Sequence, residues 1–287
     1  MGEIGKSGLE GSCGAGSEPG QGDWWRQAPS SPGIERFEAF FAGHAFDSHR
    51  HDSYALGITL AGVQSFDYRG ARADSLPGDV IILHPDERHN GRAGQAGGFR
   101  YRMLYLSPRL IAEALPEEAR ALPFVRDAVS ADARLRCVLR RALGDLERAL
   151  EPLAATEIVL GAAEALRARD PSLAAVRTAP AAHRAVEQAR EFLEANLERQ
   201  VDAAELETVS GLGRYALARQ FRARLGTSPY RYRTLRRLES ARDLIVAGHS
   251  LADAAFASGF ADQSHMTRQF KDCYGISPGR WRKLRRT

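Results

Sequence analysis

One sequence segment occurs twice near the C-terminus, and this repeat limits what the last third of the chain can fold into. The first copy reads Arg219-Gln-Phe221 and, after four residues, Gly226-Thr-Ser-Pro229. The second reads Arg268-Gln-Phe270 and, after four residues, Gly275-Ile-Ser-Pro278, so corresponding residues lie 49 positions apart. Two copies are too few for a solenoid, so the repeat predicts a tandem pair of small supersecondary units.

Each copy carries the signals of a short helix, a tight turn and a longer helix. In the first copy, Asp202-Ala-Ala-Glu205 is a capping box that opens a helix and Gly211 ends it. The second helix of this copy is predicted from Arg214 to Leu225. The other copy repeats the layout with an N-cap at Ser250, a turn at Gly259, an N-cap at Asp262 and a helix over Gln263–Tyr274. This is the layout of a helix-turn-helix module.

A single helix is predicted to join the two modules. Ser228 is a favourable N-cap, Pro229 suits the first helical position, and the helix can continue to Val246. Its apolar residues recur at spacings of three and four and form one buried stripe: Leu235, Leu238, Ala241 and Ile245. A helix of this length spans roughly 28 Å, close to the ~34 Å repeat of the major groove. Such a rod can hold two reading helices one turn of duplex apart.

Charge is distributed unevenly along the chain. Residues 211–287 contain 16 Lys and Arg against 5 Asp and Glu, a net charge of +11. The whole chain carries +4, so the first 210 residues carry −7. A basic segment that coincides with a helix-turn-helix repeat favours binding to nucleic-acid phosphates over a merely solvated surface.

The C-terminal region, residues 180–285, resembles the DNA-binding domain of the AraC/XylS family of bacterial transcription regulators. The resemblance is strongest from Leu251 to Lys271, and it continues through Gly275-Ile-Ser-Pro278 and Trp281-Arg282. Met266 departs from the aromatic or leucine residue that is usual in the family, which should alter only packing. The resemblance implies an all-α domain with two helix-turn-helix units joined by a linker helix.

The second helix of each unit is expected to enter the major groove and read bases with its N-terminal side chains. The resemblance assigns this role to Arg214, Tyr215, Ala218, Arg219, Gln263, Ser264, His265 and Arg268. Arginine can bond guanine and glutamine can bond adenine, while either can hold a phosphate. Ala218 offers only an apolar contact. The inward-facing residues are expected to be Leu217, Phe221, Phe256, Phe260, Met266 and Phe270.

Short strands with Gly and Pro punctuation are predicted between Phe37 and Leu106, as in a β-barrel or sandwich. They are predicted at residues 54–60, 66–68, 79–83 and 101–106. Three motifs resemble the cupin barrel that is fused to AraC-type regulators: His49-Arg-His51, Pro77-Gly78-Asp79 and Pro85-Asp-Glu-Arg-His89. The fold class expected for the whole chain is therefore α+β, with a cupin-like barrel, further helices and an all-α C-terminal domain.

Three histidines of these motifs could hold a metal ion or line a ligand pocket. A His-x-His pair places two imidazoles on one face of a strand, and His89 could supply a third. The enzymatic cupins add a glutamate shortly after the pair, where this chain has Tyr54, Ala55 and Leu56. A hydrogen-bonding role is therefore favoured, with neither a metal nor another cofactor expected. The candidate ligand-binding residues are His49, His51, Tyr54, His89, Tyr101 and Tyr105; His44 and His84 are expected to be ordinary barrel or turn residues.

Several classes of protein find little support in the sequence. It contains no P-loop, dinucleotide fingerprint or nucleophile elbow, so no catalytic residues are assigned and an enzyme is not expected. No apolar run approaches the ~20 residues of a membrane span, and the first thirty residues lack a secretory core. Three cysteines without CxxC spacing indicate reduced thiols in a cytoplasmic protein. Cys273 is expected to fill space in a helix.

The remaining segments complete the predicted domain organisation. Residues 1–31 are rich in Gly, Ser and Pro and should be disordered, with Trp24 and Trp25 packing on the barrel wall or forming an arm over a ligand. The ligand-binding and dimerisation domain is assigned to residues 32–170, the linker to 171–180 and the DNA-binding domain to 181–287. A leucine stripe over 135–153 predicts one amphipathic helix, followed by another over 156–167. These helices, about 132–167, could cover the barrel or pair two subunits.

Together these features predict a sequence-specific, AraC-type transcription regulator controlled by a small molecule bound in the barrel. The expected partners are an operator in double-stranded DNA, the small-molecule effector, a second subunit and, for an activator, RNA polymerase. A membrane partner is not expected. Two alternatives are a metal-dependent cupin enzyme with an accessory nucleic-acid-binding domain and a constitutive DNA-binding protein whose barrel only supports dimerisation.

Overall fold

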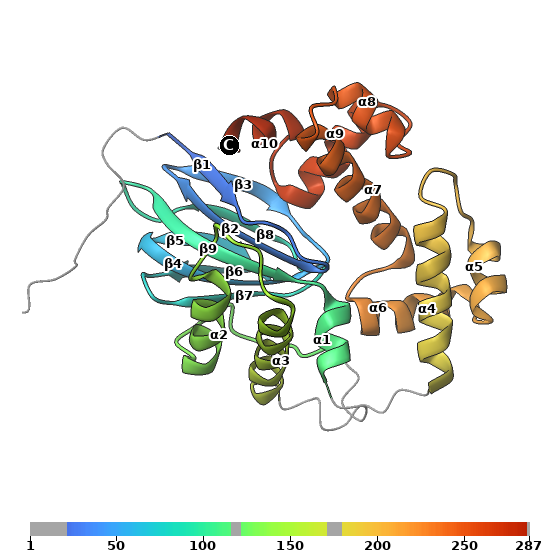
Figure 1. The fold of residues 1–287 in the computed structure, drawn as a ribbon, viewed down its shortest axis with the longest axis horizontal. Coiled ribbons are helices and arrows are strands. Elements are labelled where there is room, and N and C mark those ends of the chain that lie inside the picture. Colours follow the sequence, from blue (N-terminus) through green and yellow to red (C-terminus); the bar gives the residue numbers. More distant parts are fainter. Residues whose placement is uncertain (1–21, 116–121, 171–179, 286–287) are drawn as a thin grey trace, which may run out of the picture.

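The protein is described by a computed structural model that covers residues 22–115, 122–170 and 180–285. It has two parts, seen side by side in Figure 1. We call residues 22–170 the sheet domain and residues 180–285 the helical domain. The predicted α+β class is confirmed. The predicted linker lies almost wholly outside the described residues.

The sheet domain is built from two antiparallel sheets. The first has the strand order β1-β2-β9-β4-β7-β10 and the second has the order β3-β8-β5-β6. The strands are β1 (Trp24–Gln27), β2 (Ile34–Phe41), β3 (His44–His49), β4 (Tyr54–Gly62), β5 (Gln64–Tyr68), β6 (Ala71–Ser75), β7 (Val80–Leu83), β8 (His89–Ala93), β9 (Phe99–Leu106) and β10 (Val129–Ser130). The four strands predicted between residues 54 and 106 correspond to β4, β5, β7 and β9.

The six-stranded sheet is buried on both faces, because alternate residues of each strand belong to different cores. Along β9, Leu104 and Leu106 pack with three helices, whereas Tyr101 and Met103 face the interior of the sheet domain. The helices are α1 (Pro108–Ala114), α2 (Ala133–Leu143) and α3 (Pro152–Ala168). In Figure 1, α2 and α3 lie on the side of the sheets away from α8 and α9. This leaves the opposite face of the sheet free to line a binding site.

The predicted single helix through the leucine stripe is wrong. Helix α2 ends at Leu143, a new helix begins at Pro152, and Leu153 is 81% exposed. The buried guanidinium of Arg36 donates hydrogen bonds to the carbonyl oxygens of Ala142, Asp145 and Arg148 at 3.0, 2.8 and 2.6 Å. These bonds satisfy carbonyl groups that a continuing helix would bond itself, so the chain can turn here.

Part of the segment that was predicted to be disordered, residues 1–31, forms a strand. Residues 1–21 lie outside the described part, but Trp24–Gln27 form strand β1, which pairs antiparallel with β2 over the register Trp24↔Phe40 to Gln27↔Phe37. The two tryptophans therefore belong to the sheet itself. Their position on the wall was one of the two predicted alternatives.

The helical domain follows the predicted layout closely. It contains α4 (Pro180–Ala195), α5 (Ala203–Ser210), α6 (Arg214–Leu225), α7 (Pro229–Val246), α8 (Leu251–Ala257), α9 (Gln263–Tyr274) and α10 (Pro278–Leu284). Asp202 and Glu205 form the predicted capping box, and Gly211 ends α5 in the left-handed conformation. The boundaries of α6, α7 and α9 agree with the sequence-based predictions, because each is set by local capping residues.

Helix α7 joins two separate hydrophobic cores. Its Tyr232 packs with Leu217 and Phe221 of the first unit, while its buried stripe from Leu235 to Ile245 packs with the second unit.

Phe256 was predicted to be a core residue, but it is 84% exposed on α8. The helix turns this position outward between the buried Ala254 and Ala255 and the turn that follows. Among the described residues, no helix is both long and apolar enough to cross a lipid bilayer.

Candidate ligand cavity and nucleic-acid interface

A cavity lies where the two domains meet, and both domains line it. We call it the interdomain cavity. The sheet domain supplies Trp25, Phe37, the three motif histidines, Tyr101 and Tyr105, and the helical domain supplies Leu235, Glu239, Arg242, Cys273, Tyr274, Ile276 and Trp281. Its volume is about 80 Å³, several times the roughly 10–15 Å³ that one water molecule requires. A small organic molecule placed here would contact both domains.

The three motif histidines form one cluster in the wall of this cavity. His49 at the end of β3 and His89 at the start of β8 are directly opposite each other in the antiparallel pair. The ring centroid of His89 lies 4.2 Å from that of His49 and 4.8 Å from that of His51. All three residues are buried. The structure thus brings together the three histidines that the sequence motifs singled out.

Backbone carbonyl groups fix the tautomer of each imidazole in the cluster. The Nδ1 atom of His49 lies 2.8 Å from the carbonyl oxygen of Asp47, that of His51 lies 2.9 Å from Ser53, and that of His89 lies 3.0 Å from Glu87. A carbonyl oxygen only accepts, so each Nδ1 carries the proton and donates. In the neutral imidazole, Nε2 is then an acceptor.

Burial favours the neutral form of these rings. It lowers the pKa of His89 to about 4. It also lowers the pKa values of His49 and His51 well below the usual range, and charge on the neighbouring histidines acts in the same direction. Within the described residues, the Nε2 atom of His51 is buried without a hydrogen-bond partner. At neutral pH the cluster is therefore uncharged and presents at least one unsatisfied acceptor, Nε2 of His51.

The same structure weighs against a metal ion at this cluster. In the part of the chain that the structure describes, no group of three or more His, Cys, Asp and Glu side chains is arranged to hold a metal. The carboxylate that directly follows His51, that of Asp52, is paired with Arg236 at 2.5 Å, and β4 then begins with Tyr54, Ala55 and Leu56. The imidazoles fit hydrogen bonding better than metal coordination.

Aromatic side chains form much of the rest of the cavity wall. The ring of Trp25 stacks on Phe37 with a centroid distance of 3.9 Å, and Phe37 stacks on Tyr105 at 5.6 Å. Trp281 of α10 lines the cavity from the helical domain. Trp25 was predicted to pack on the wall or to cover a ligand, and it lines the cavity from β1. The helical-domain side of the cavity was not among the candidate site residues, because no local signal marks a contact between distant segments.

Tyr54 was predicted to bind the ligand, and this prediction is wrong. Its side chain points to the opposite face of the sheet, where it packs with Leu56 and Leu106, and its hydroxyl donates to the carbonyl oxygen of Pro123 at 2.7 Å. Residues Tyr101 and Tyr105 do line the interdomain cavity. Since side chains alternate along a strand, a residue near the motif in sequence can face away from it.

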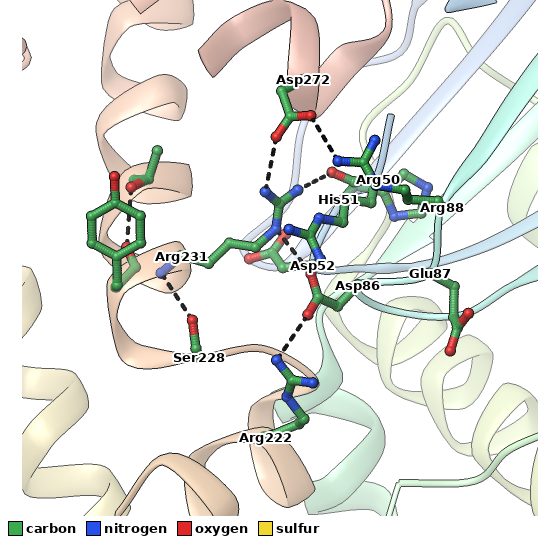
Figure 2. A network of polar contacts seen from close by, with 12 residues as sticks. Arg50, His51, Asp52, Asp86, Glu87, Arg88, Arg222, Ser228, Arg231 and Asp272 are labelled. Atoms are coloured by element: carbon green, nitrogen blue, oxygen red, sulfur yellow. Dashed lines mark hydrogen bonds and ion pairs between the residues drawn. The ribbon is translucent and has the colours of Figure 1, made fainter. Parts of the chain in front are cut away.

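A network of arginines and aspartates holds the helical domain against the sheet domain (Figure 2). The Asp86 carboxylate lies 3.0 Å from Nε of Arg231, 3.2 Å from Arg50 and 3.4 Å from Arg222. The side chains of Asp86 and Arg231 are only 8% and 11% exposed. Arg231 also reaches Asp272 of α9 at 3.5 Å. We call these residues the Asp86 network.

A second set of contacts surrounds the interdomain cavity. Arg242 of α7 makes a bidentate ion pair with Glu35 of β2, at 2.9 and 2.7 Å. Arg236 donates to Asp52 at 2.5 Å. At the end of α9, the carbonyl oxygen of Gly275 accepts from the backbone N–H of Asp47 at 2.9 Å. Helices α7 and α9 are thus attached to the rim of the cavity.

The predicted base-reading side chains lie away from these contacts. Arg214, Tyr215, Arg219, Gln263, Ser264 and Arg268 are exposed, and Ala218 and His265 are partly exposed. Arg214 lies 3.2 Å from Glu207, and the backbone N–H of His265 is bonded by the N-cap Asp262 at 2.7 Å. The helical domain is docked through the C-terminal ends of α6 and α9, so the N-terminal ends of both helices remain accessible.

Comparison with known families agrees with this division of the chain. Residues 31–163 match the model of the AraC-like ligand binding domain, and residues 206–284 match that of a helix-turn-helix domain. The chain is 27% identical to the uncharacterized HTH-type transcriptional regulator YbfI of Bacillus subtilis (strain 168) over 223 residues, which is 77% of this chain and 81% of the relative.

Solved structures show the same arrangement of elements. The crystal structure of ToxT from Vibrio cholerae O395 has a TM-score of 0.63 at 12% identity, with 88% of this chain and 98% of that chain covered. ToxT from strain SCE256 with a bound unsaturated fatty acid has a TM-score of 0.61 at 12% identity, covering 92% and 94% of the two chains. At this identity, the likeness concerns the fold alone.

Proposed function

Because the chain belongs to the AraC family of transcription regulators, with an N-terminal ligand-binding domain and a C-terminal helix-turn-helix domain, we propose that a small molecule in the interdomain cavity controls how the two reading helices meet DNA. The observation that carries this proposal is that α7 and α9 line the cavity. Helix α7 joins the two helix-turn-helix units, and α9 is the reading helix of the second unit. Any molecule in the cavity acts directly on elements that DNA binding requires.

We call the helical domain docked when it packs against the sheet domain and released when it does not. A ligand can control this equilibrium only if its affinity differs between the two arrangements. In the docked arrangement the ligand contacts both domains, whereas in the released arrangement it loses every contact to α7, α9 and α10. The ligand therefore favours docking by the free energy of those contacts. ToxT, which has the same fold, has been crystallised with a bound unsaturated fatty acid, which supports binding of a small molecule by a chain of this fold.

DNA recognition is proposed to use the eight predicted side chains at the N-terminal ends of α6 and α9. Exposed arginines at Arg219 and Arg268 suit guanine edges or phosphates. The basic character of residues 211–287 supplies the general attraction to duplex DNA.

The remaining partners are proposed from surface features and family membership. Leu153 and Leu160 are 81% and 43% exposed on α3, which is one of the helices for which pairing of two subunits was one of two predicted roles. An apolar strip of this kind suits a homodimer that binds two half-sites. Contact with RNA polymerase is proposed for an activator, and a cytoplasmic location follows from a role on DNA.

The proposed function can be tested by recovering genomic fragments on the purified full-length chain and measuring their affinity by fluorescence anisotropy. We expect specific fragments whose affinity falls when Arg219 or Arg268 is replaced by Ala. Retained affinity in both variants would exclude the assigned reading helices. Sequence-independent binding in the wild-type chain would exclude an operator-specific regulator.

A further inference from the structure

The wall of the interdomain cavity contains buried hydrogen-bond acceptors that no donor within the described residues satisfies. The three motif histidines present Nε2 acceptors, because each Nδ1–H is already donated to a backbone carbonyl oxygen. Within the described residues, Nε2 of His51 and Oε1 of Gln64 are buried without any partner, and the two residues are 6% and 7% exposed. A buried acceptor without a partner is costly, so these atoms require donors from whatever occupies the cavity.

Among the described residues that line it, the cavity offers no free cation to an anionic ligand. Arg242 is the only arginine or lysine among its lining residues, and both ends of its guanidinium are bonded to Glu35. The nearby Arg236 is paired with Asp52 and Glu239, at 2.5 and 2.9 Å. A carboxylate ligand would have to displace one of these internal carboxylates and would also face the lone pairs of three neutral imidazoles.

The apolar walls suit a flat ring. Trp25, Phe37 and Tyr105 stack successively along one side, and Trp281 lies among the helical-domain residues. Aromatic walls of this type bind ring-shaped ligands by stacking and edge-to-face contacts. The Nε1–H group of Trp25 has no acceptor in the described part of the chain, so the ligand should also carry an oxygen that can accept.

We propose that the ligand of the interdomain cavity is a small, uncharged aromatic compound with hydroxyl groups, of the phenol or catechol class. Its hydroxyl groups donate to the histidine cluster, chiefly to Nε2 of His51, and its ring lies against the aromatic wall. A hydroxyl group donates one hydrogen bond and can also accept, so two hydroxyl groups can donate to His51 and Gln64 while one of them accepts from Trp25. This inference rests on the proposed function, since it names the chemical class of the effector.

The test is calorimetric titration of the full-length chain with catechol, with benzoate and with zinc chloride. Catechol is expected to bind, and benzoate, which has a similar ring but only acceptor oxygens, is expected to bind at least about 5-fold more weakly. In the His51→Leu variant, catechol affinity should fall by about 5-fold or more. His51→Gln keeps a polar group and should lose less, and His249→Ala, an exposed histidine remote from the cavity, should lose nothing. Thermal unfolding of each variant verifies that it is folded.

Four results would overturn the inference. They are absence of catechol binding, benzoate binding as tight as catechol binding, catechol binding that His51→Leu leaves unchanged, and stoichiometric zinc binding that His51→Leu abolishes. The last result would make the cluster a metal site. DNA affinity measured with saturating catechol separates this inference from the proposed function. Catechol that binds without changing DNA affinity refutes control by the ligand, whereas benzoate that binds and changes DNA affinity refutes only the assigned chemical class.

Discussion

The two helix-turn-helix units are copies of one another, yet they meet the sheet domain to different extents. Each presents the glycine that ends its reading helix. Gly226 of the first unit lies against Pro85, whereas Gly275 of the second lies against Phe46, Asp47 and His49. The first unit adds the ion pair of Arg222 with Asp86, but the second also lines the interdomain cavity. The two copies of the motif therefore differ in their contact with the ligand cavity.

The difference indicates where control acts. The second unit and α7 touch the cavity, so occupancy of the cavity bears on them first, and the first unit follows through its attachment to α7. The reading side chains are exposed in both units, so docking leaves them uncovered. Control would then act on the relative placement of the two reading helices, which must match successive major grooves to bind together.

The largest effect on docking is expected from Asp86→Ala. This change leaves the nearly buried Arg231 without its closest ion-pair partner and also removes partners of Arg50 and Arg222. Docking should weaken by about 2–4 kcal/mol. The reporter is the labelling rate of Cys273, which lines the cavity and is 2% exposed, in a chain whose other two cysteines, Cys13 and Cys137, are replaced by Ser.

The control for this change is Asp272→Ala, which removes a carboxylate of the same network that is 40% exposed. Exposed ion pairs contribute about 0–1 kcal/mol, so Cys273 labelling should accelerate little. Equal acceleration in the two variants would contradict the central position of Asp86 in the network.

A smaller effect is expected from Gly275→Ala, which tests the deeper contact of the second unit. A Cβ atom at this position would lie 2.7 Å from the His49 ring and 2.9 Å from the carbonyl oxygen of Asp47. We expect docking to weaken by about 1–3 kcal/mol beyond the backbone cost of φ +69°. Gly211→Ala is the matched control, because Gly211 has φ +67° and nothing within 4 Å of a Cβ atom. Similar Cys273 labelling in both variants would show that the contact with β3 is not tight.

These docking contacts mark the limit of what the sequence could predict. The helices of the two units were predicted almost to the residue, because N-caps such as Ser228 and left-handed glycines such as Gly211 act within a few residues. The histidine cluster was predicted because its motifs resemble those of a cupin barrel. The Asp86 network joins residues far apart in the chain, and neither Asp86 nor Arg231 carries a local signal of its partner.

The errors have a similar physical origin. Tyr54 and Phe256 were assigned to the wrong side of their elements, because composition marks a residue as apolar without fixing which surface covers it. The helix over the leucine stripe was extended too far, since the carbonyl-capping role of Arg36 depends on a strand more than a hundred residues away. Gly144 and Pro152 within the stripe were local indications of a break.

DNA binding compares the two units directly. Arg219 and Arg268 occupy corresponding positions of the repeat and are both exposed. Replacing either by Ala should weaken operator binding by about 1–3 kcal/mol, measured by anisotropy at fixed salt concentration. Arg282→Ala, which removes an exposed charge outside both reading helices, is the control. A loss confined to one of the two variants would mean that only one unit reads bases.

The smallest effect concerns pH. Burial raises the pKa of Glu239 on α7 to about 7, with the nearby Asp52 and Glu35 of the sheet domain adding to the shift and Arg236 and Arg242 opposing it. A raised pKa means that the protonated form favours the docked state, so this contribution is present at low pH and is lost as the pH rises through about 7.

Docking should therefore weaken as the pH rises from about 4.5, the usual pKa of glutamate, to about 7, by less than about 1 kcal/mol because the Glu239 side chain is 34% exposed. The measurement is the Cys273 labelling rate across this range, divided by the rate in the Glu239→Gln variant to cancel the pH dependence of the thiol reaction. If this ratio of labelling rates stays constant across the pH range, any pH dependence of docking comes from groups outside α7. A ratio that rises would make the helix between the two units the site at which protonation and docking are coupled.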